Sequence, residues 1–170
     1  MDVYLIVLRI VHVIAGAFWV GAGLTASLFL QPTAREVGPA AGPFMTHLAQ
    51  RKRLPDVMLA AAGLTILAGL LMYWQVSDGF DADWIGSAYG LTITIGALAA
   101  IAAAALGGSV VRRSMSKAGA IAQSAAAGGG PTPEQASEMQ ALQRRTRTAG
   151  ALMLGLLVVA TALMAAAQYV

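Results

Sequence analysis

The chain has 170 residues, 58% of them hydrophobic and 11% charged, and its formal net charge is +3. Soluble domains carry about 25% charged residues, so this composition is typical of a membrane protein. The absence of cysteine excludes disulfides, thiolate metal sites and iron–sulfur clusters held by this chain. The basic residues gather in two segments beside apolar stretches, a pattern that indicates membrane orientation and predicts no nucleic-acid partner.

Four apolar stretches are long enough to cross a bilayer, because roughly 20 apolar residues span its hydrocarbon core. With their flanking residues they predict four transmembrane helices, at about residues 4–30, 55–75, 88–111 and 148–170. The lipid bilayer is therefore the first partner of the chain. We expect one all-α domain over residues 1–170, an integral membrane four-helix bundle.

The charges of the connections predict which side of the membrane each one faces. The connections at 31–54 and 112–147 hold every lysine and arginine except Arg9, whereas residues 75–87 contain aspartates and no basic residue. Cytoplasmic loops are enriched in Lys and Arg. We therefore expect both basic connections in the cytoplasm and both termini outside (N-out/C-out), in a bacterial-type inner (plasma) membrane.

A helical hairpin is predicted within the connection at 112–147. Residues 128–131, Gly-Gly-Gly-Pro, interrupt the chain, and Thr132 to Gln135 match a capping box with proline at the first helical position. Helices 3 and 4 are thus expected to project into the cytoplasm as a hairpin. This hairpin is either a solvated stalk or a docking site for a partner.

A short amphipathic helix is predicted on the cytoplasmic surface within the connection at 31–54. Phe44, Met45 and Leu48 would supply its apolar side, and a run of cations at 51–53 follows them. Pro55 then suits the start of the second transmembrane helix, since proline is favoured at the first helical position.

Arg9 and His12 are ionisable residues inside the first apolar run, and such residues in a membrane are by default candidates for function. They lie one helical turn apart. Neutral imidazole is a common ligand of haem and of metals, so His12 is predicted to bind haem b or a metal. Arg9, one turn nearer the outer surface, would then pair with a haem propionate. The competing interpretation is that His12 hydrogen-bonds a neighbouring helix while Arg9 reaches lipid headgroups, Asp2 or Asp83.

A second axial ligand has to come from another helix, because the other histidine, His47, is expected on the opposite side of the membrane. Met164 is the nearest candidate in depth and Met72 is shallower; Met/His ligation occurs in cytochromes c. A five-coordinate haem and a site completed by another subunit are the alternatives. The leading prediction is haem b held by His12 with Arg9 and Met164, in electron transfer or a redox complex.

Two further functions stay open. A cofactor-free accessory or scaffold subunit would bind other membrane subunits, or a second copy of the chain, through the hairpin and through small residues at spacing four such as Gly96 and Ala100. Copper handling is the third, since methionine is a soft ligand for Cu(I), but the eight methionines are scattered along the chain. Whether the chain is an enzyme is left open.

The first helix also carries a family resemblance. The stretch Leu8-Arg9-Ile10-Val11-His12-Val13-Ile14-Ala15-Gly16, followed by Phe18-Trp19-Val20-Gly21, resembles the first helix of CopD-like small membrane proteins. The first 75 residues are similar to the HemJ-type protoporphyrinogen oxidases, in which a basic segment and a Gly-Leu-rich helix follow, here at 51–54 and 63–74. The resemblance implies haem binding at His12. Residues 31–35 replace the Pro-Arg-Leu segment of those enzymes, so it implies the superfamily rather than oxidase activity.

Overall fold

The structure, a computed structural model, describes residues 3–170, and every regular element in that part of the chain is a helix. Four helices are long and apolar enough to cross a membrane, as expected for a multi-pass membrane protein with a helical bundle. The first runs continuously over Val3–Val37 and combines α1 (Val3–Thr25), a π-helical turn (Ala26–Leu30) and α2 (Gln31–Val37). The second is α4 (Leu54–Val76).

The third long helix combines α6 (Ala88–Leu106), a π-helical turn (Gly107–Val111) and α7 (Arg112–Ala127). The fourth is α8 (Pro133–Ala166), which ends in a 3-10 turn (Ala167–Tyr169). Short elements fill two of the connections: a 3-10 turn (Gly38–Ala41), α3 (Gly42–Thr46) and a π-helical turn (His47–Arg51) before α4, and α5 (Ala82–Gly86) before α6. A short helix is therefore present where the sequence predicts one around Phe44.

The first long helix continues beyond its predicted end at residue 30, although Pro32 follows directly. Proline lacks a backbone N–H and normally interrupts the i to i−4 hydrogen bonds of a helix. Here a π-helical turn precedes it, in which the Gln31 N–H donates to the Ala26 carbonyl oxygen. Pro32 then falls in the first turn of α2, where the hydrogen-bond register has just changed and a missing donor is tolerated.

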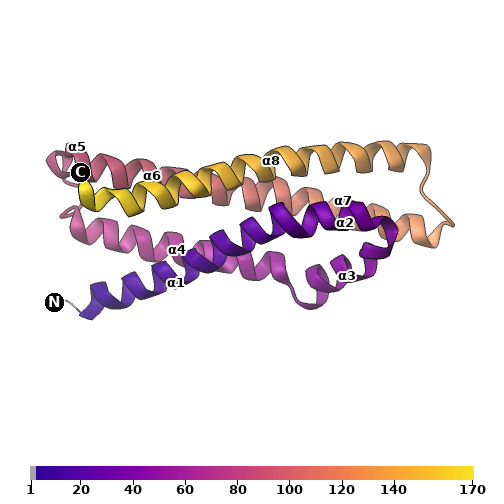
Figure 1. The fold of residues 1–170 in the computed structure, drawn as a ribbon, viewed down its shortest axis with the longest axis horizontal. Coiled ribbons are helices and arrows are strands. Elements are labelled where there is room, and N and C mark those ends of the chain that lie inside the picture. Colours follow the sequence, from indigo (N-terminus) through magenta and orange to yellow (C-terminus); the bar gives the residue numbers. More distant parts are fainter. Residues whose placement is uncertain (1–2) are drawn as a thin grey trace.

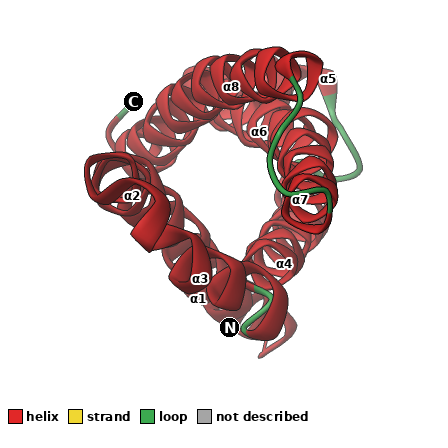
Figure 2. Cartoon of the chain, turned by 90° about the vertical axis from the view of Figure 1, so that its right-hand side faces the viewer, coloured by secondary structure: helices red, strands yellow, loops and turns green. Residues whose placement is uncertain are grey.

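The long helices run along the longest axis of the molecule, and both termini lie at the same end as α5 (Figure 1). The turn between α7 and α8 lies at the opposite end. A view along the bundle shows α1 beside α4, and α6 beside α8 (Figure 2). The bundle thus consists of two helix pairs, α1–α4 and α6–α8.

Small side chains dominate the core between the helices. Trp19 is the one large aromatic ring in the buried cluster, which otherwise comprises Ala61, Ala62, Ala99, Ala100, Ala103, Met153, Leu157 and Ala160. Helices in a membrane gain little from burying apolar surface, and small residues let their backbones approach closely. Gly96 illustrates this: a Cβ there would lie 3.4 Å from the Ala160 carbonyl oxygen and 3.4 Å from Met164 Cγ, both on α8.

The predicted hairpin is present as a pair of helices, because α7 and α8 follow each other along the chain and pack against each other. Its second arm begins at the predicted capping box: the Gln135 N–H donates to Thr132 Oγ1 at 3.2 Å, and the Thr132 N–H donates to Gln135 Oε1 at 3.0 Å. Lys117 on α7 pairs with Glu138 on α8. The Gln135 Nε2 amide donates to Ser124 Oγ at 3.1 Å.

Contacts at both ends hold α4 in place. At its N-terminal end, Asp56 pairs with Arg53 (3.3 Å) and with Arg112 of α7 (3.0 Å). At the other end, the Tyr73 hydroxyl hydrogen-bonds Thr94 Oγ1 of α6 at 2.7 Å, and the Tyr73 ring meets the Trp84 ring edge-on. The register of α4 against its neighbours is therefore fixed on both sides of its middle.

Candidate functional site

His12 lies in α1 and packs against the middle of α4. The ring is half-buried, and its Nδ1 atom lies 2.8 Å from the backbone carbonyl oxygen of Thr65. This hydrogen bond is between two helices, so part of the competing interpretation of His12, contact with a neighbouring helix, is confirmed. Thr65 is 7% exposed, and its own hydroxyl donates back to the Ala61 carbonyl oxygen at 2.8 Å.

The Thr65 hydrogen bond determines which ring nitrogen carries the proton. A carbonyl oxygen only accepts hydrogen bonds, so Nδ1 of His12 must be the donor. In the neutral ring the lone pair then belongs to Nε2. No hydrogen bond of Nε2 is found within residues 3–170. The lone pair of this nitrogen is therefore available to bind a metal ion.

Two glycines shape the surroundings of the imidazole. Gly69 lies one turn after Thr65, and a Cβ built on it would come within 3.0 Å of both Cε1 and Nδ1 of His12. Gly16, one turn after His12, faces Thr65: a Cβ there would lie 3.4 Å from Thr65 Cγ2. The imidazole and Thr65 therefore fit between α1 and α4 because neither glycine carries a side chain.

Arg9 is exposed on α1. Its side chain forms no ion pair or hydrogen bond in the part of the chain that the structure describes. Asp83, one of its predicted partners, is exposed and has no ion pair there either, while Asp2 lies outside the described residues. The Arg9 guanidinium is thus free to bind an anion that does not belong to residues 3–170.

Met164 belongs to the other helix pair. Its Cγ atom lies beside Gly96 of α6, whereas His12 packs on α4. The structure therefore joins His12 to Thr65 and Gly69, while the contact that it shows for Met164 is with α6. His47 is exposed in the turn before α4.

Thr65 and Gly69 are the site residues that sequence analysis missed. The available signal was weak: a threonine and a glycine four residues apart share one face of a helix. Nothing in the sequence says that this face meets His12, because the spacing of apolar residues does not reveal which helices are neighbours. Small residues occur on every face of α4.

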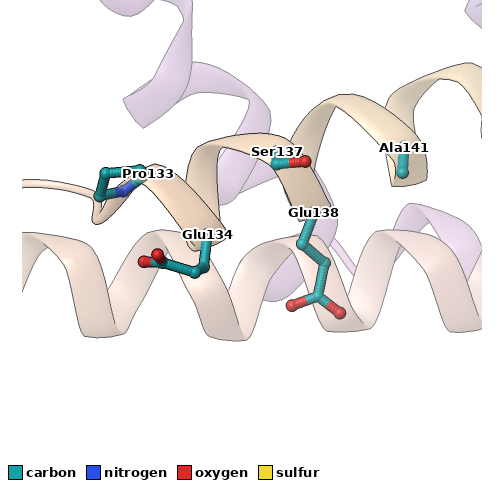
Figure 3. A pocket seen from close by; sticks show the side chains of 5 residues that line it. All are labelled: Pro133, Glu134, Ser137, Glu138 and Ala141. Atoms are coloured by element: carbon teal, nitrogen blue, oxygen red, sulfur yellow. The ribbon is translucent and has the colours of Figure 1, made fainter.

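The hairpin carries two hollows, both remote from His12. One, of about 600 Å³, is a shallow depression on the first turns of α8, where Glu134 and Glu138 lie on the same side of the helix (Figure 3). Hydrogen bonds from its own backbone N–H and from Thr132 hold the pKa of Glu134 below its ordinary value, and Glu138 pairs with Lys117. Glu134 thus interacts within the first turn of α8, whereas Glu138 joins α8 to α7.

The other hollow, of about 370 Å³, lies between the two arms near the tip of the hairpin. Its lining is almost entirely apolar and comprises Ile121, Ala122, Ala125, Pro131, Gln135, Ala136 and Met139. It contains no titratable group.

Within residues 3–170 no group of three or more His, Asp or Glu side chains could hold a metal ion. Haem differs because its iron needs only one or two ligands from the protein. Comparisons of the chain with protein-family models, with curated proteins and with solved structures find no match.

Proposed function

We propose that this protein binds a b-type haem through Nε2 of His12 and takes part in electron transfer or a redox complex in a membrane. The observation that carries the proposal is the hydrogen bond from His12 Nδ1 to the Thr65 carbonyl oxygen. A histidine that ligates a metal almost always donates its other ring N–H to a carbonyl or carboxylate, which fixes the ring and raises the basicity of the ligating nitrogen. Haem, when bound, supplies an iron that carries one electron.

Arg9 supports haem rather than a bare metal ion. It lies three residues from His12, or about 4.5 Å along the helix axis, and its guanidinium has no ion-pair partner within residues 3–170. Guanidinium groups bind carboxylates through paired hydrogen bonds. If haem is held by His12, the Arg9 guanidinium would be the residue of this helix that binds one of its propionates. The resemblance of this helix to CopD-like and HemJ-type proteins favours the same cofactor.

Met164 stays a prediction as the second axial ligand. The contact found for its Cγ atom, with Gly96, belongs to the α6–α8 pair, and this contact gives no support for a ligand role. The proposal therefore rests on His12 alone as the ligand from this chain. A five-coordinate haem and a ligand from a second subunit remain compatible with it.

We further propose that the protein lies N-out and C-out in a bacterial-type inner membrane, with the hairpin in the cytoplasm. The support is the distribution of cations: apart from Arg9, all lysines and arginines lie at or beyond the end of the bundle that carries the hairpin, and all of them are exposed. The positive-inside rule assigns that end to the cytoplasm. His12 and Arg9 would then lie in the outer half of the bilayer.

A cofactor-free accessory or scaffold subunit is the second candidate. The same hydrogen bond favours it, since a histidine that joins α1 to α4 can serve helix packing alone. The two candidates differ in the use of Nε2, which only a cofactor ligand requires. Copper handling stays an untested prediction.

The visible spectrum of the protein separates these candidates. The full chain, expressed with ample haem and purified in detergent, is expected to show a reduced haem band with dithionite, and the His12→Ala variant is expected to lose it. The His47→Ala variant is the matched control, because it removes the other histidine of the chain from an exposed turn. A colourless parent would contradict the haem proposal and favour the scaffold.

A further inference from the structure

We propose that Gly69 is a positioning residue for His12. Because it has no side chain, the imidazole can approach α4 and donate from Nδ1–H to the Thr65 carbonyl oxygen, which makes Nε2 the ligating nitrogen. The tautomer itself is independent of any cofactor, whereas its use for ligation rests on the haem function proposed above. Gly69 lies in α4, which contributes no ligand of its own. This glycine would thus determine whether Nδ1 or Nε2 of His12 carries the proton.

The first step is steric. A Cβ on Gly69 would lie 3.0 Å from Cε1 and 3.0 Å from Nδ1 of His12, which is closer than carbon atoms ordinarily approach. Both of these ring atoms lie on the edge that faces α4. An alanine at this position would therefore push against the ring edge that carries the donor.

The second step concerns the hydrogen bond. The Nδ1 to Thr65 oxygen distance is 2.8 Å, near the middle of the normal range. The Thr65 carbonyl belongs to the helix backbone, so it cannot follow the ring when the ring is displaced. Displacement lengthens and weakens this bond, and a weaker bond to Thr65 reduces the preference of the proton for Nδ1. Nε2 then ceases to be the obligatory lone-pair nitrogen.

Gly63 provides a matched control on the same helix. Gly63 lies in α4 as well, is exposed, and would meet no atom within 4 Å if it carried a Cβ. Gly63→Ala and Gly69→Ala therefore make the same chemical change in the same helix. They differ in whether the new methyl group touches His12.

The experiment reads the tautomer and the haem separately. The full chain, with His47→Gln so that His12 is the single histidine, is labelled with ¹⁵N-histidine and studied by NMR in detergent, first free of haem. We expect Nδ1 protonated and Nε2 unprotonated in the neutral parent and in Gly63→Ala, and a mixture of tautomers in Gly69→Ala. Haem is then titrated into each protein, and Gly69→Ala is expected to bind it roughly 10- to 100-fold more weakly, the usual effect of losing a partner of a metal ligand.

Each outcome decides one of the two claims. An Nε2–H tautomer in the haem-free parent overturns the inference. This test needs no variant, so it does not depend on whether Gly69→Ala folds. A Gly69→Ala protein that keeps the parent tautomer, and whose haem affinity stays within about threefold of Gly63→Ala, also overturns it. A tautomer shift in Gly69→Ala together with no haem binding by any protein supports the positioning role and contradicts the haem proposal.

Discussion

The two helix pairs of this bundle differ in the chemistry of their contacts. The α6–α8 pair is closed by small apolar side chains, with Ala103 and Leu157 almost completely buried. The α1–α4 pair contains polar groups at its centre, the His12 ring and the Thr65 backbone carbonyl. Helix α1 is also less buried: its buried residues are Trp19 and Gly23, whereas five residues of α8 are buried.

This difference shows which helix pair can contain a side chain with an unused polar atom. Removing a buried side chain from a tightly closed pair leaves a void that its neighbours cannot fill. A half-buried imidazole on a peripheral helix satisfies one nitrogen within the protein and leaves the other for a partner. The comparison predicts that substitutions in α6–α8 lower stability, whereas substitutions around His12 change chemistry more than stability.

The largest effect on stability is expected for Leu157→Ala. The Leu157 side chain is 1% exposed, and its Cδ1 atom lies 3.7 Å from the Cβ position of Gly23 on α1. The substitution leaves a cavity, while lipid offers an apolar environment to the unpacked helices, so we expect a loss of about 2 kcal/mol, the lower end of the range for soluble cores. Unfolding by sodium dodecyl sulfate in mixed micelles measures it.

The control is Leu152→Ala on the same helix, where the leucine is 58% exposed. It removes the same atoms without opening a cavity. Equal losses of stability in the two variants would contradict the account of α8 as a tightly packed helix.

A smaller loss is expected for His12→Ala. It deletes one interhelical hydrogen bond, and such bonds contribute about 0.6 to 2 kcal/mol in membranes. The Thr65 carbonyl remains in the backbone of its helix, so no buried group is left without a partner. The same mixed-micelle titration measures this loss. A destabilisation larger than that of Leu157→Ala would mean that His12 serves packing first, as the scaffold function requires.

The hairpin is expected to respond locally to Thr132→Ala. The substitution removes the side-chain oxygen that caps the first turn of α8, at a cost of about 1 kcal/mol. Hydrogen exchange of the amides of residues 134–137 should accelerate by roughly fivefold, the equivalent of that free energy. Thr148→Ala, in the middle of the same helix, should leave the exchange of these residues unchanged. Unaltered exchange in Thr132→Ala would contradict the capping role.

The smallest effect is expected for Thr65→Val. His12 bonds the carbonyl of Thr65, while the hydroxyl only bonds back to Ala61 within its own helix. Valine keeps the shape and the carbonyl, so stability should change by less than about 0.5 kcal/mol. The haem spectrum should also be unchanged. A loss of haem comparable to that of His12→Ala would show that the hydroxyl takes part in the site.

Much of the fold was predictable because its signals are local. The lengths of the apolar runs predict four spanning helices, and the capping box at Thr132 predicts where α8 begins. The continuation of the first helix to Val37 was not predicted, because Pro32 usually ends a helix and the π-helical turn before it has no clear sequence signal.

The site was predictable only in part. His12 is conspicuous because it is ionisable and lies in an apolar run, and that property can be read from the sequence alone. Its partners depend on which face of α1 meets which helix, and the sequence contains no information on helix order in the bundle. Thr65 and Gly69 became visible once α1 and α4 were seen in contact.

The most direct test of the account is rescue of a His12→Gly variant by free imidazole. The variant removes the ligand and leaves a space of the same shape beside Gly69. With dithionite and haem present, the account predicts that the variant lacks the parent's reduced haem band and regains it when imidazole is added. A variant that keeps the parent's band without imidazole would contradict His12 as the haem ligand.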